Sequence, residues 1–149
     1  TDRKTLDAFA NADTDTVFQF HTHVAKGVLN KMNSVSGLED LAAITALGRP
    51  GPMDVGMDAK FIARKNGTEP IEYPHSSLEG ILKDTYGIMV YQEQVMLSVQ
   101  NLGGFSLEES DEVRRAMGSK NKELLNSYKN RPYMNNAKTG ITDYKFNYG

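Results

Sequence analysis

The sequence predicts a mainly α-helical protein with at most one short strand or hairpin. The longer regular segments carry apolar residues at spacings near 3.6, which is the period of an amphipathic helix. A serine stands three residues before a glutamate at the start of two such segments, as in the capping box that begins many helices. Clusters of glycine and proline separate the segments from one another.

The N-terminal elements follow from these signals in order. Residues 1–16 form a polar lead that predicts a short helix and then an Asn/Asp/Thr turn. A second helix is expected over residues 23–32, and a third begins at the Ser-Gly-Leu-Glu capping pattern of residues 36–39. The Arg-Pro-Gly-Pro turn at residues 49–52 must end the third helix, because proline lacks a backbone donor and disfavours helical geometry in the residue before it.

The central segments are shorter. Residues 53–65 predict a helix closed by an Asn-Gly pair that tolerates left-handed backbone angles. Residues 71–73 are the one place where a short strand is expected, and the serine pair at 76–77 caps a brief helix. The longest regular segment covers residues 88–102 and carries one apolar stripe. The predicted core residues are Phe61, Ile88, Tyr91, Val95, Val99 and Leu102.

The C-terminal helices have clear start signals. A glycine pair at 103–104 ends the long helix, and the capping box of residues 106–109 opens the next one with an acidic first turn. A Gly-Ser break then leads into a basic helix over residues 122–129. Residues 131–149 show no period, so no regular structure is assigned to this atypical tail.

Composition limits the class of protein. A chain of 149 residues with 39% hydrophobic content normally makes one domain. The 17 basic and 19 acidic residues nearly balance, but residues 113–131 carry six basic residues against one acidic residue. The absence of cysteine suits a reducing cytoplasm, and no apolar run approaches the length of a membrane span. The chain begins with Thr1 rather than methionine, so we expect a piece of a longer cytoplasmic protein.

Three short runs carry the most specific signal in the sequence. They are ALGRPGPM at 46–53, TYGIMVYQEQVM at 85–96 and RRAMGSK at 114–120. In this order and spacing, within a match from about residue 13 to residue 128, they resemble the fingers region of the bacterial or phage DNA polymerase III alpha subunit, a C-family replicative DNA polymerase. The resemblance implies a helical fingers domain at 17–130, with residues 1–16 ending the connection from the palm.

The resemblance also implies an activity and its partners. The chain is expected to be part of a DNA-directed DNA polymerase and to position the incoming dNTP and the template during DNA replication. The family's catalytic carboxylates lie in the palm, so no catalytic residue and no metal ligand is expected in this chain, and Mg²⁺ is bound elsewhere in the complete enzyme. The expected partners are template-primer DNA, dNTP, the palm and thumb of the same polymerase, and replisome subunits such as a sliding clamp; no membrane is involved.

The phosphate-binding role falls on Arg114 and Arg115 by resemblance. As neighbours on a helix they lie about 100° apart, so they do not point the same way by themselves. An alternative is structural, because Asp111 and Glu112 precede Arg115 by four and three residues, where exposed ion pairs form. Lys120 is expected to extend the basic surface toward phosphates, with simple solvation as the equal alternative.

Four further residues are candidate DNA or nucleotide contacts: Arg49, Gln92, Gln94 and Lys122. A rigid turn fixes Arg49, which suits a backbone phosphate or a structural carboxylate equally well. The two glutamines flank the apolar stripe, and hydrogen bonds within the fingers are favoured for them over substrate contact. For Lys122, as for Lys120, contact with phosphate and simple solvation are equal alternatives.

Other polar groups favour structural explanations. His21 and His23 lack a third ligand nearby, which argues against a metal. Asp54 and Asp58 share a helix face at four-residue spacing, but capping and solvation explain them better. Arg64 and its neighbouring lysine end a helix, where the helix dipole alone favours cations.

Two rival functions stay open at this point. One is a stand-alone, phage-like module that binds nucleotide or nucleic acid without catalysis. The other is a folded remnant without function.

Overall fold

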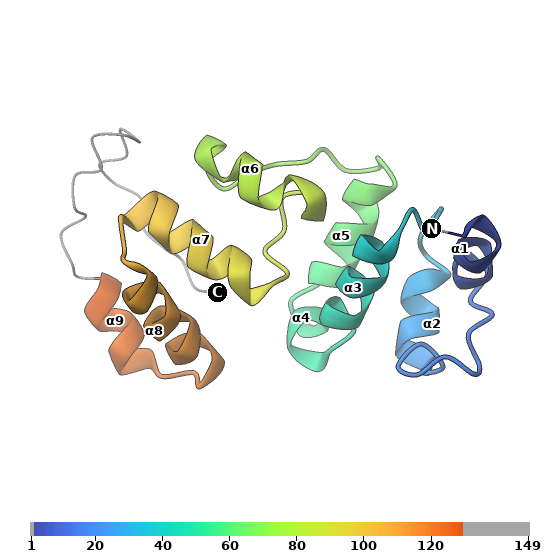
Figure 1. The fold of residues 1–149 in the computed structure, drawn as a ribbon, viewed down its shortest axis with the longest axis horizontal. Helices are drawn as coiled ribbons and strands as arrows, with labels where there is room; N and C mark the ends of the chain where they lie inside the picture. Colours follow the sequence, from blue (N-terminus) through green and yellow to red (C-terminus); the bar gives the residue numbers. More distant parts are fainter. Residues whose placement is uncertain (1, 130–149) are drawn as a thin grey trace. The chain divides into compact units, whose positions relative to one another are not determined.

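The computed structural model describes residues 2–129 (Figure 1). In this part of the chain, nine α-helices and two short 3-10 helices form two compact units. Unit 1 contains residues 2–72 and Lys83–Val90, and unit 2 contains Tyr73–Leu82 and residues 91–129. The chain therefore leaves unit 1, returns to it and leaves it again. The predicted mainly α-helical class is confirmed.

Unit 1 is organised around α3. Its elements are α1 (Arg3–Ala10), α2 (His23–Leu29), α3 (Leu38–Leu47), α4 (Pro50–Asp54), α5 (Met57–Lys65) and the 3-10 helix η2 (Lys83–Thr85). Ile44 of α3 belongs to one hydrophobic cluster with Leu6 and Leu29, whereas Leu47 belongs to a second cluster with Phe61. Because α3 supplies side chains to both clusters, it joins the two parts of the unit's core.

The start of α3 differs from the prediction. The N-cap is Gly37 and makes no side-chain capping bond, so Ser36 does not open a capping box. Instead, the carboxylate of Asp40 accepts a hydrogen bond from the Ser36 main-chain N–H at 2.6 Å. Asp40 therefore accepts the main-chain hydrogen bond that the capping-box pattern predicted for Glu39.

The helix expected over residues 53–65 is divided into two. Helix α3 ends at Leu47 as predicted, but Pro50 then opens the short helix α4, where its missing N–H costs nothing. Gly56, at φ +70°, stops α4 from running on and becomes the N-cap of α5. The Arg-Pro-Gly-Pro sequence therefore follows the end of α3 and begins α4.

The long helix expected over residues 88–102 begins later than predicted. Helix α7 runs from Gln92 to Gly103, and Tyr91 is its N-cap. Ile88 lies in unit 1, where it packs in the cluster of Phe61, so the stripe of residues 88–102 is not one helix face. Val99 is buried as predicted, but the side chain of Val95 is only half-buried. Tyr86 and Gly87, at φ +54° and +77°, have left-handed backbone angles a few residues before α7 begins.

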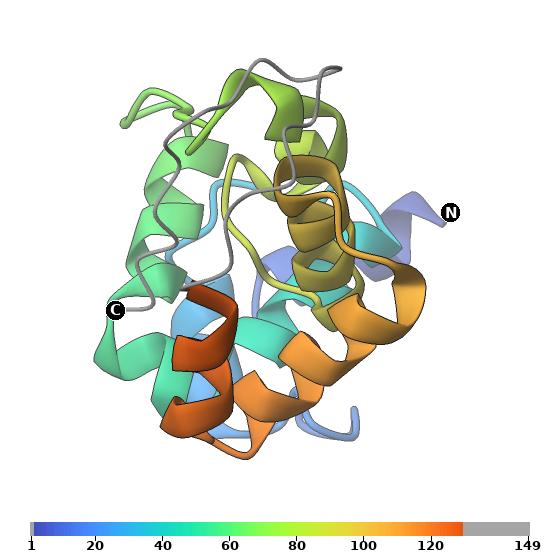
Figure 2. The ribbon, with the colours of Figure 1, turned by 90° about the vertical axis from the view of Figure 1, so that its left-hand side faces the viewer.

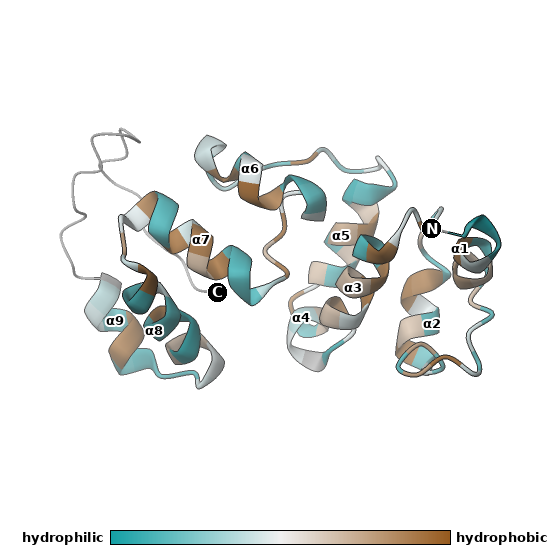
Figure 3. Cartoon of the chain, in the orientation of Figure 1, coloured by the Kyte–Doolittle hydropathy of each residue, from teal (hydrophilic) through white to brown (hydrophobic). Residues whose placement is uncertain are grey.

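Unit 2 contains η1 (Ser76–Leu78), α6 (Glu79–Leu82), α7, α8 (Leu107–Gly118) and α9 (Lys122–Lys129). Figure 2 shows α8 and α9 side by side, and Figure 3 shows that α7 carries both hydrophobic and hydrophilic positions. The predicted capping box of α8 is confirmed: the Ser106 hydroxyl accepts the Glu109 N–H, and the Glu109 carboxylate accepts the Ser106 N–H. The rings of Phe105 and Tyr128 pack edge to face, with 5.5 Å between their centroids, and this contact joins α9 to the residues that precede α8.

Residues 71–73 form no strand in the structure. Among the helices described, none has the length and apolar character needed to cross a membrane. The predicted tail, residues 131–149, lies outside the described residues.

Candidate functional site

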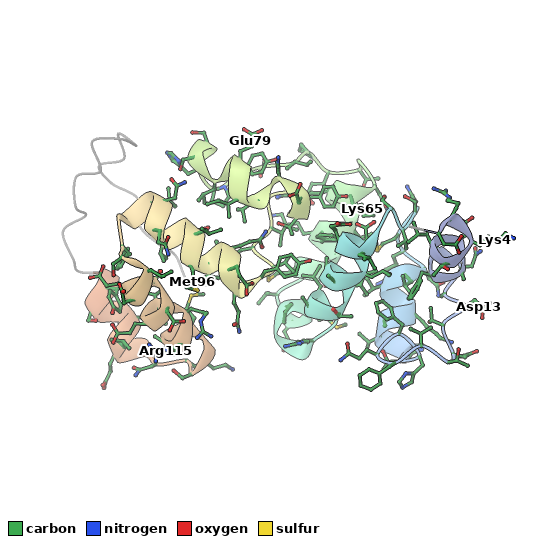
Figure 4. The ribbon with its side chains drawn as sticks, viewed as in Figure 1. Lys4, Asp13, Lys65, Glu79, Met96 and Arg115 are labelled. Atoms are coloured by element: carbon green, nitrogen blue, oxygen red, sulfur yellow. The ribbon has the colours of Figure 1, made fainter. Side chains whose placement is uncertain are left out.

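The two arginines that are predicted to bind phosphate both contact the carboxylate of Asp111. On α8, Nε of Arg114 lies 2.8 Å from Oδ1 of Asp111, and Nε of Arg115 lies 3.1 Å from Oδ2 of the same residue. Arg115, labelled in Figure 4, has a side chain that is 66% exposed, and the Arg114 side chain is 28% exposed. The ion pair between Arg115 and Asp111 is the structural alternative that the sequence offered, and the phosphate-binding role of the two arginines remains a prediction. Asp111 also brings together two side chains that the helix alone would separate.

Gln92 joins this cluster from the neighbouring helix. Its Oε1 atom accepts a hydrogen bond from Nη1 of Arg114 at 3.2 Å, across the contact between the start of α7 and α8. Arg114 is thus bound by two side chains from two helices, whereas Arg115 is bound by Asp111. The cluster formed by Gln92, Asp111, Arg114 and Arg115 is called the arginine cluster below.

Gln94 is used differently. The residue is 7% exposed, its Oε1 accepts the Tyr91 main-chain N–H at 3.0 Å, and its Nε2 donates to the Ile81 carbonyl at 3.2 Å. These bonds tie the start of α7 to α6. A contact between Gln94 and DNA or nucleotide remains a prediction, and the observed bonds favour the structural alternative.

The two candidate lysines lie in the connection between α8 and α9. Lys120 has φ +54°, and Lys122 is the first residue of α9. Both side chains are exposed, and neither has a hydrogen-bond or ion-pair partner among residues 2–129. The Asn121 side chain between them accepts the Leu124 N–H at 3.1 Å and so fixes the start of α9. The two lysines therefore flank a fixed turn with their charges open to solvent.

Arg49 belongs to unit 1 rather than to the unit that contains the arginine cluster. It lines an open cavity of about 230 Å³ together with Gln19, Thr22, Ala25, Ile44, Thr45 and Gly48. The extended backbone of Arg49 precedes Pro50 and serves as the N-cap of α4. Its guanidinium has no partner among the described residues. Its expected contact with DNA or nucleotide is therefore compatible with its exposure and remains a prediction.

Arg64 and Lys65 lie in the last turn of α5, as expected, but the interpretation that the helix dipole alone explains them was wrong. Arg64 is 5% exposed, and its guanidinium binds main-chain carbonyls of two other segments. Lys65, labelled in Figure 4, places Nζ 2.7 Å from the buried carboxylate of Asp40. The spacing of apolar residues does not predict that these two cations are buried, because their partners are distant in sequence.

The remaining polar candidates do not assemble into a metal site in the described part of the chain. The break at Gly56 puts Asp54 at the end of α4 and Asp58 in the first turn of α5, so they do not share one helix face as expected. The ring of His21 contacts the Val17 carbonyl at 3.2 Å. In unit 1, a hydrogen bond from Lys26 lowers the pKa of the exposed Asp15 carboxyl.

The sequence profile of the bacterial DNA polymerase III alpha subunit finger domain matches residues 1–140 of the chain. The chain belongs to this finger domain family. The predicted resemblance is thereby confirmed, and all seven candidate contact residues lie within the matched range.

Comparison with individual DNA polymerase III alpha subunits shows the same relationship. The chain is 51% identical to the DNA polymerase III subunit alpha of Helicobacter pylori over 124 residues, which are 83% of the chain and 10% of that relative. It is 46% identical to the subunit of Bacillus subtilis over 124 residues, 83% of the chain and 11% of that relative. With the subunit of Aquifex aeolicus, the identity is 39% over 144 residues, 97% of the chain and 12% of that relative. This finger domain thus spans about a tenth of the relatives it matches.

Proposed function

We propose that this chain positions the incoming dNTP and the DNA template within a DNA-directed DNA polymerase, the alpha subunit of a replicative polymerase III. In this proposal, Arg114 and Arg115 bind the phosphates of the nucleotide, and Lys120 extends that surface. The observation that carries the proposal is the convergence of both guanidinium groups on Asp111, since two adjacent forks suit a ligand with several phosphate groups. Membership of the finger domain family supports the same role.

The candidate contacts to DNA are Arg49, Gln92, Gln94 and Lys122. Arg49 and Lys122 are the stronger of the four, because their charges have no partner in the described residues and are exposed. Gln92 already binds Arg114, so its contribution runs through that side chain. We keep Gln94 as a weaker candidate for the structural reason given above.

The rest of the polymerase supplies the chemistry. Nucleotidyl transfer uses two divalent ions on clustered carboxylates, and in this proposal Mg²⁺ binds to the palm of the complete enzyme. The further partners are template-primer DNA, the thumb and replisome subunits such as a sliding clamp, in the cytoplasm. Residues 17–130 act as the fingers, and residues 1–16 continue the connection from the palm. The isolated chain is expected not to extend a primer with any divalent metal.

A chimeric polymerase tests the proposal. Residues 1–129 replace the matching segment of the Helicobacter pylori alpha subunit, and template-dependent extension is measured at varied dNTP concentration. The chimera is expected to be active, and Arg114→Ala or Arg115→Ala is expected to raise KM for dNTP or lower kcat by roughly 10-fold or more, because a charge-assisted phosphate contact is lost. Arg→Lys restores part of the activity, since lysine lacks the planar fork.

The matched control is Arg3→Ala, which removes an exposed arginine of α1 that also pairs with an aspartate one turn away. Its kinetics are expected to equal those of the parent chimera. Unchanged dNTP kinetics in both α8 variants would refute the phosphate role. A chimera that binds nucleotide but never extends a primer would favour the stand-alone binding module instead.

A further inference from the structure

Asp111 contacts both arginines of the arginine cluster. It precedes Arg114 by three residues and Arg115 by four, so it is one turn away from both on the same helix. We infer that Asp111 is a positioning residue, which holds the two guanidinium groups together for a single polyphosphate ligand. This inference rests on the proposed function of the arginines.

The atoms involved leave the ligand-binding edges open. Asp111 accepts a hydrogen bond from Nε of Arg114 on Oδ1, and its Oδ2 forms an ion pair with Nε of Arg115 at 3.1 Å. Oε1 of Gln92 accepts a hydrogen bond from Nη1 of Arg114. A guanidinium has five N–H donors. Nη2 of Arg114 and both terminal amino groups of Arg115 donate no hydrogen bond to another side chain or carbonyl within the described residues. These donors are the ones that a phosphate oxygen would bind.

Without Asp111 the arginines would have no common anchor. Adjacent residues on a helix point about 100° apart, and an exposed arginine side chain loses considerable rotamer freedom when a ligand fixes it. A carboxylate that fixes both side chains beforehand reduces that entropic cost. It also makes the contributions of the two arginines to binding depend on each other.

The charge of Asp111 acts in the opposite direction. A carboxylate beside two guanidinium groups reduces their attraction for phosphate, so a mere counter-ion would weaken binding. This penalty is small because Asp111 is 36% exposed and its field is screened by water. Fixing two long side chains has the larger effect, and removal of the carboxylate is therefore expected to weaken binding.

The Asp111→Asn variant, which removes the carboxylate, is expected to fold, since exposed ion pairs contribute little to stability. The nearby acid Glu112 does not replace Asp111, because its carboxylate contacts the hydroxyl of Tyr128. Glu108, in the exposed first turn of the same helix, provides a control with the same change of charge. Thermal unfolding of each variant checks the fold before binding is measured.

The test is an NMR titration of the ¹⁵N-labelled 149-residue chain with sodium tripolyphosphate, which follows the Nε–H signals of Arg114 and Arg115. Asp111→Asn is expected to raise Kd roughly 5-fold to 10-fold, because two side chains lose their preset positions. Asp111→Glu, which still reaches both arginines, restores most of the affinity. Glu108→Gln leaves Kd within about twofold of the parent, since it removes an equal charge without an arginine contact.

A second measurement separates positioning from charge. Arg115→Ala is expected to weaken binding strongly in the parent chain and much less in the Asp111→Asn background, because contacting residues give non-additive effects. Equal or tighter binding by Asp111→Asn, or an undiminished effect of Arg115→Ala in that background, would overturn the inference. If neither arginine variant changes Kd in the parent chain, the proposed phosphate role itself fails. If both do and Asp111→Asn does not, only the role of Asp111 fails.

Discussion

Arg64 donates a hydrogen bond from Nη1 to the main-chain carbonyl oxygen of Tyr86, at 3.0 Å. The same nitrogen lies 3.0 Å from the carbonyl oxygen of Glu72, and Nε contacts the Glu69 carboxylate at 3.2 Å. Glu72 ends the first segment of unit 1, and Tyr86 lies in the segment that returns to it. One buried side chain on α5 thus holds the two segments together.

Replacing Arg64 is therefore expected to destabilise unit 1. Arg64→Met leaves two carbonyl groups without their donor, and the free energy of unfolding should fall by roughly 3 kcal/mol. Arg64→Lys should recover only part of this, because an ammonium does not match the fork. Urea unfolding followed by amide exchange in α3 and α5 measures the effect. Arg3→Met, which breaks an exposed ion pair, is expected to cost less than about 1 kcal/mol; equal losses would contradict the interpretation.

Gly87 is expected to be intolerant of any side chain. It has φ +77°, and an added Cβ would lie 2.3 Å from the Glu72 carbonyl oxygen and 2.9 Å from Nη1 of Arg64. Gly67 is the matched control, since its φ is +74° and nothing lies within 4 Å of its added Cβ. Both alanine variants carry a left-handed backbone cost of about 1–2 kcal/mol. Gly87→Ala should lose at least about 2 kcal/mol more, because overpacking adds to it; similar midpoints in urea would disprove this.

The Lys65–Asp40 pair is expected to be stabilising only while both charges are present. The two side chains are 5% and 8% exposed, so Lys65→Met leaves a buried carboxylate without its cation. The expected loss is roughly 3–5 kcal/mol, and adding Asp40→Asn should restore part of it. Lys60→Met serves as the control, because that lysine lies 4.0 Å from Glu69 and is 52% exposed. Thermal and urea unfolding compare the three variants, and the absence of any recovery in the double variant would count against this account.

On α7, Val99 is expected to be more sensitive to a charge than Val95. Val99 is 2% exposed, whereas Val95 is half-buried and gives an introduced carboxylate a route to water. Val99→Asp should destabilise unit 2 by roughly 3 kcal/mol or more, and Val95→Asp by clearly less. Far-ultraviolet circular dichroism during urea unfolding, together with amide exchange in α7 and α8, provides the measurement. A larger loss from Val95→Asp would restore the sequence-based assignment of that residue to the core.

Local signals predicted the C-terminal helices well. The basic helix was expected at residues 122–129 and is found as Lys122–Lys129, and the capping box at Ser106 opens α8. Both depend on contacts within one turn of helix, which a sequence pattern contains directly. The ion pair between Asp111 and Arg115 was predictable for the same reason.

Features that depend on distant segments were not predictable. Ile88 continues the 3.6-residue spacing of the following helix, yet it is buried with Phe61 in unit 1. The bond from Gln92 to Arg114 requires the packing of α7 on α8, and the burial of Arg64 requires a returning segment. Periodicity reports which side of a helix is apolar but gives no information on which partner covers it.

The divided course of unit 1 has a consequence for synthesis of the chain. A nascent chain that has reached Glu72 already contains α1 to α5, but it lacks Ile88 and the Tyr86 carbonyl. Its second hydrophobic cluster is then incomplete, and Arg64 has no acceptor in the returning segment. Unit 1 can therefore reach its final packing only after residues 83–90 have been synthesised, and a truncation after Glu72 would remove Ile88 and Tyr86 from the side chains that pack against Phe61.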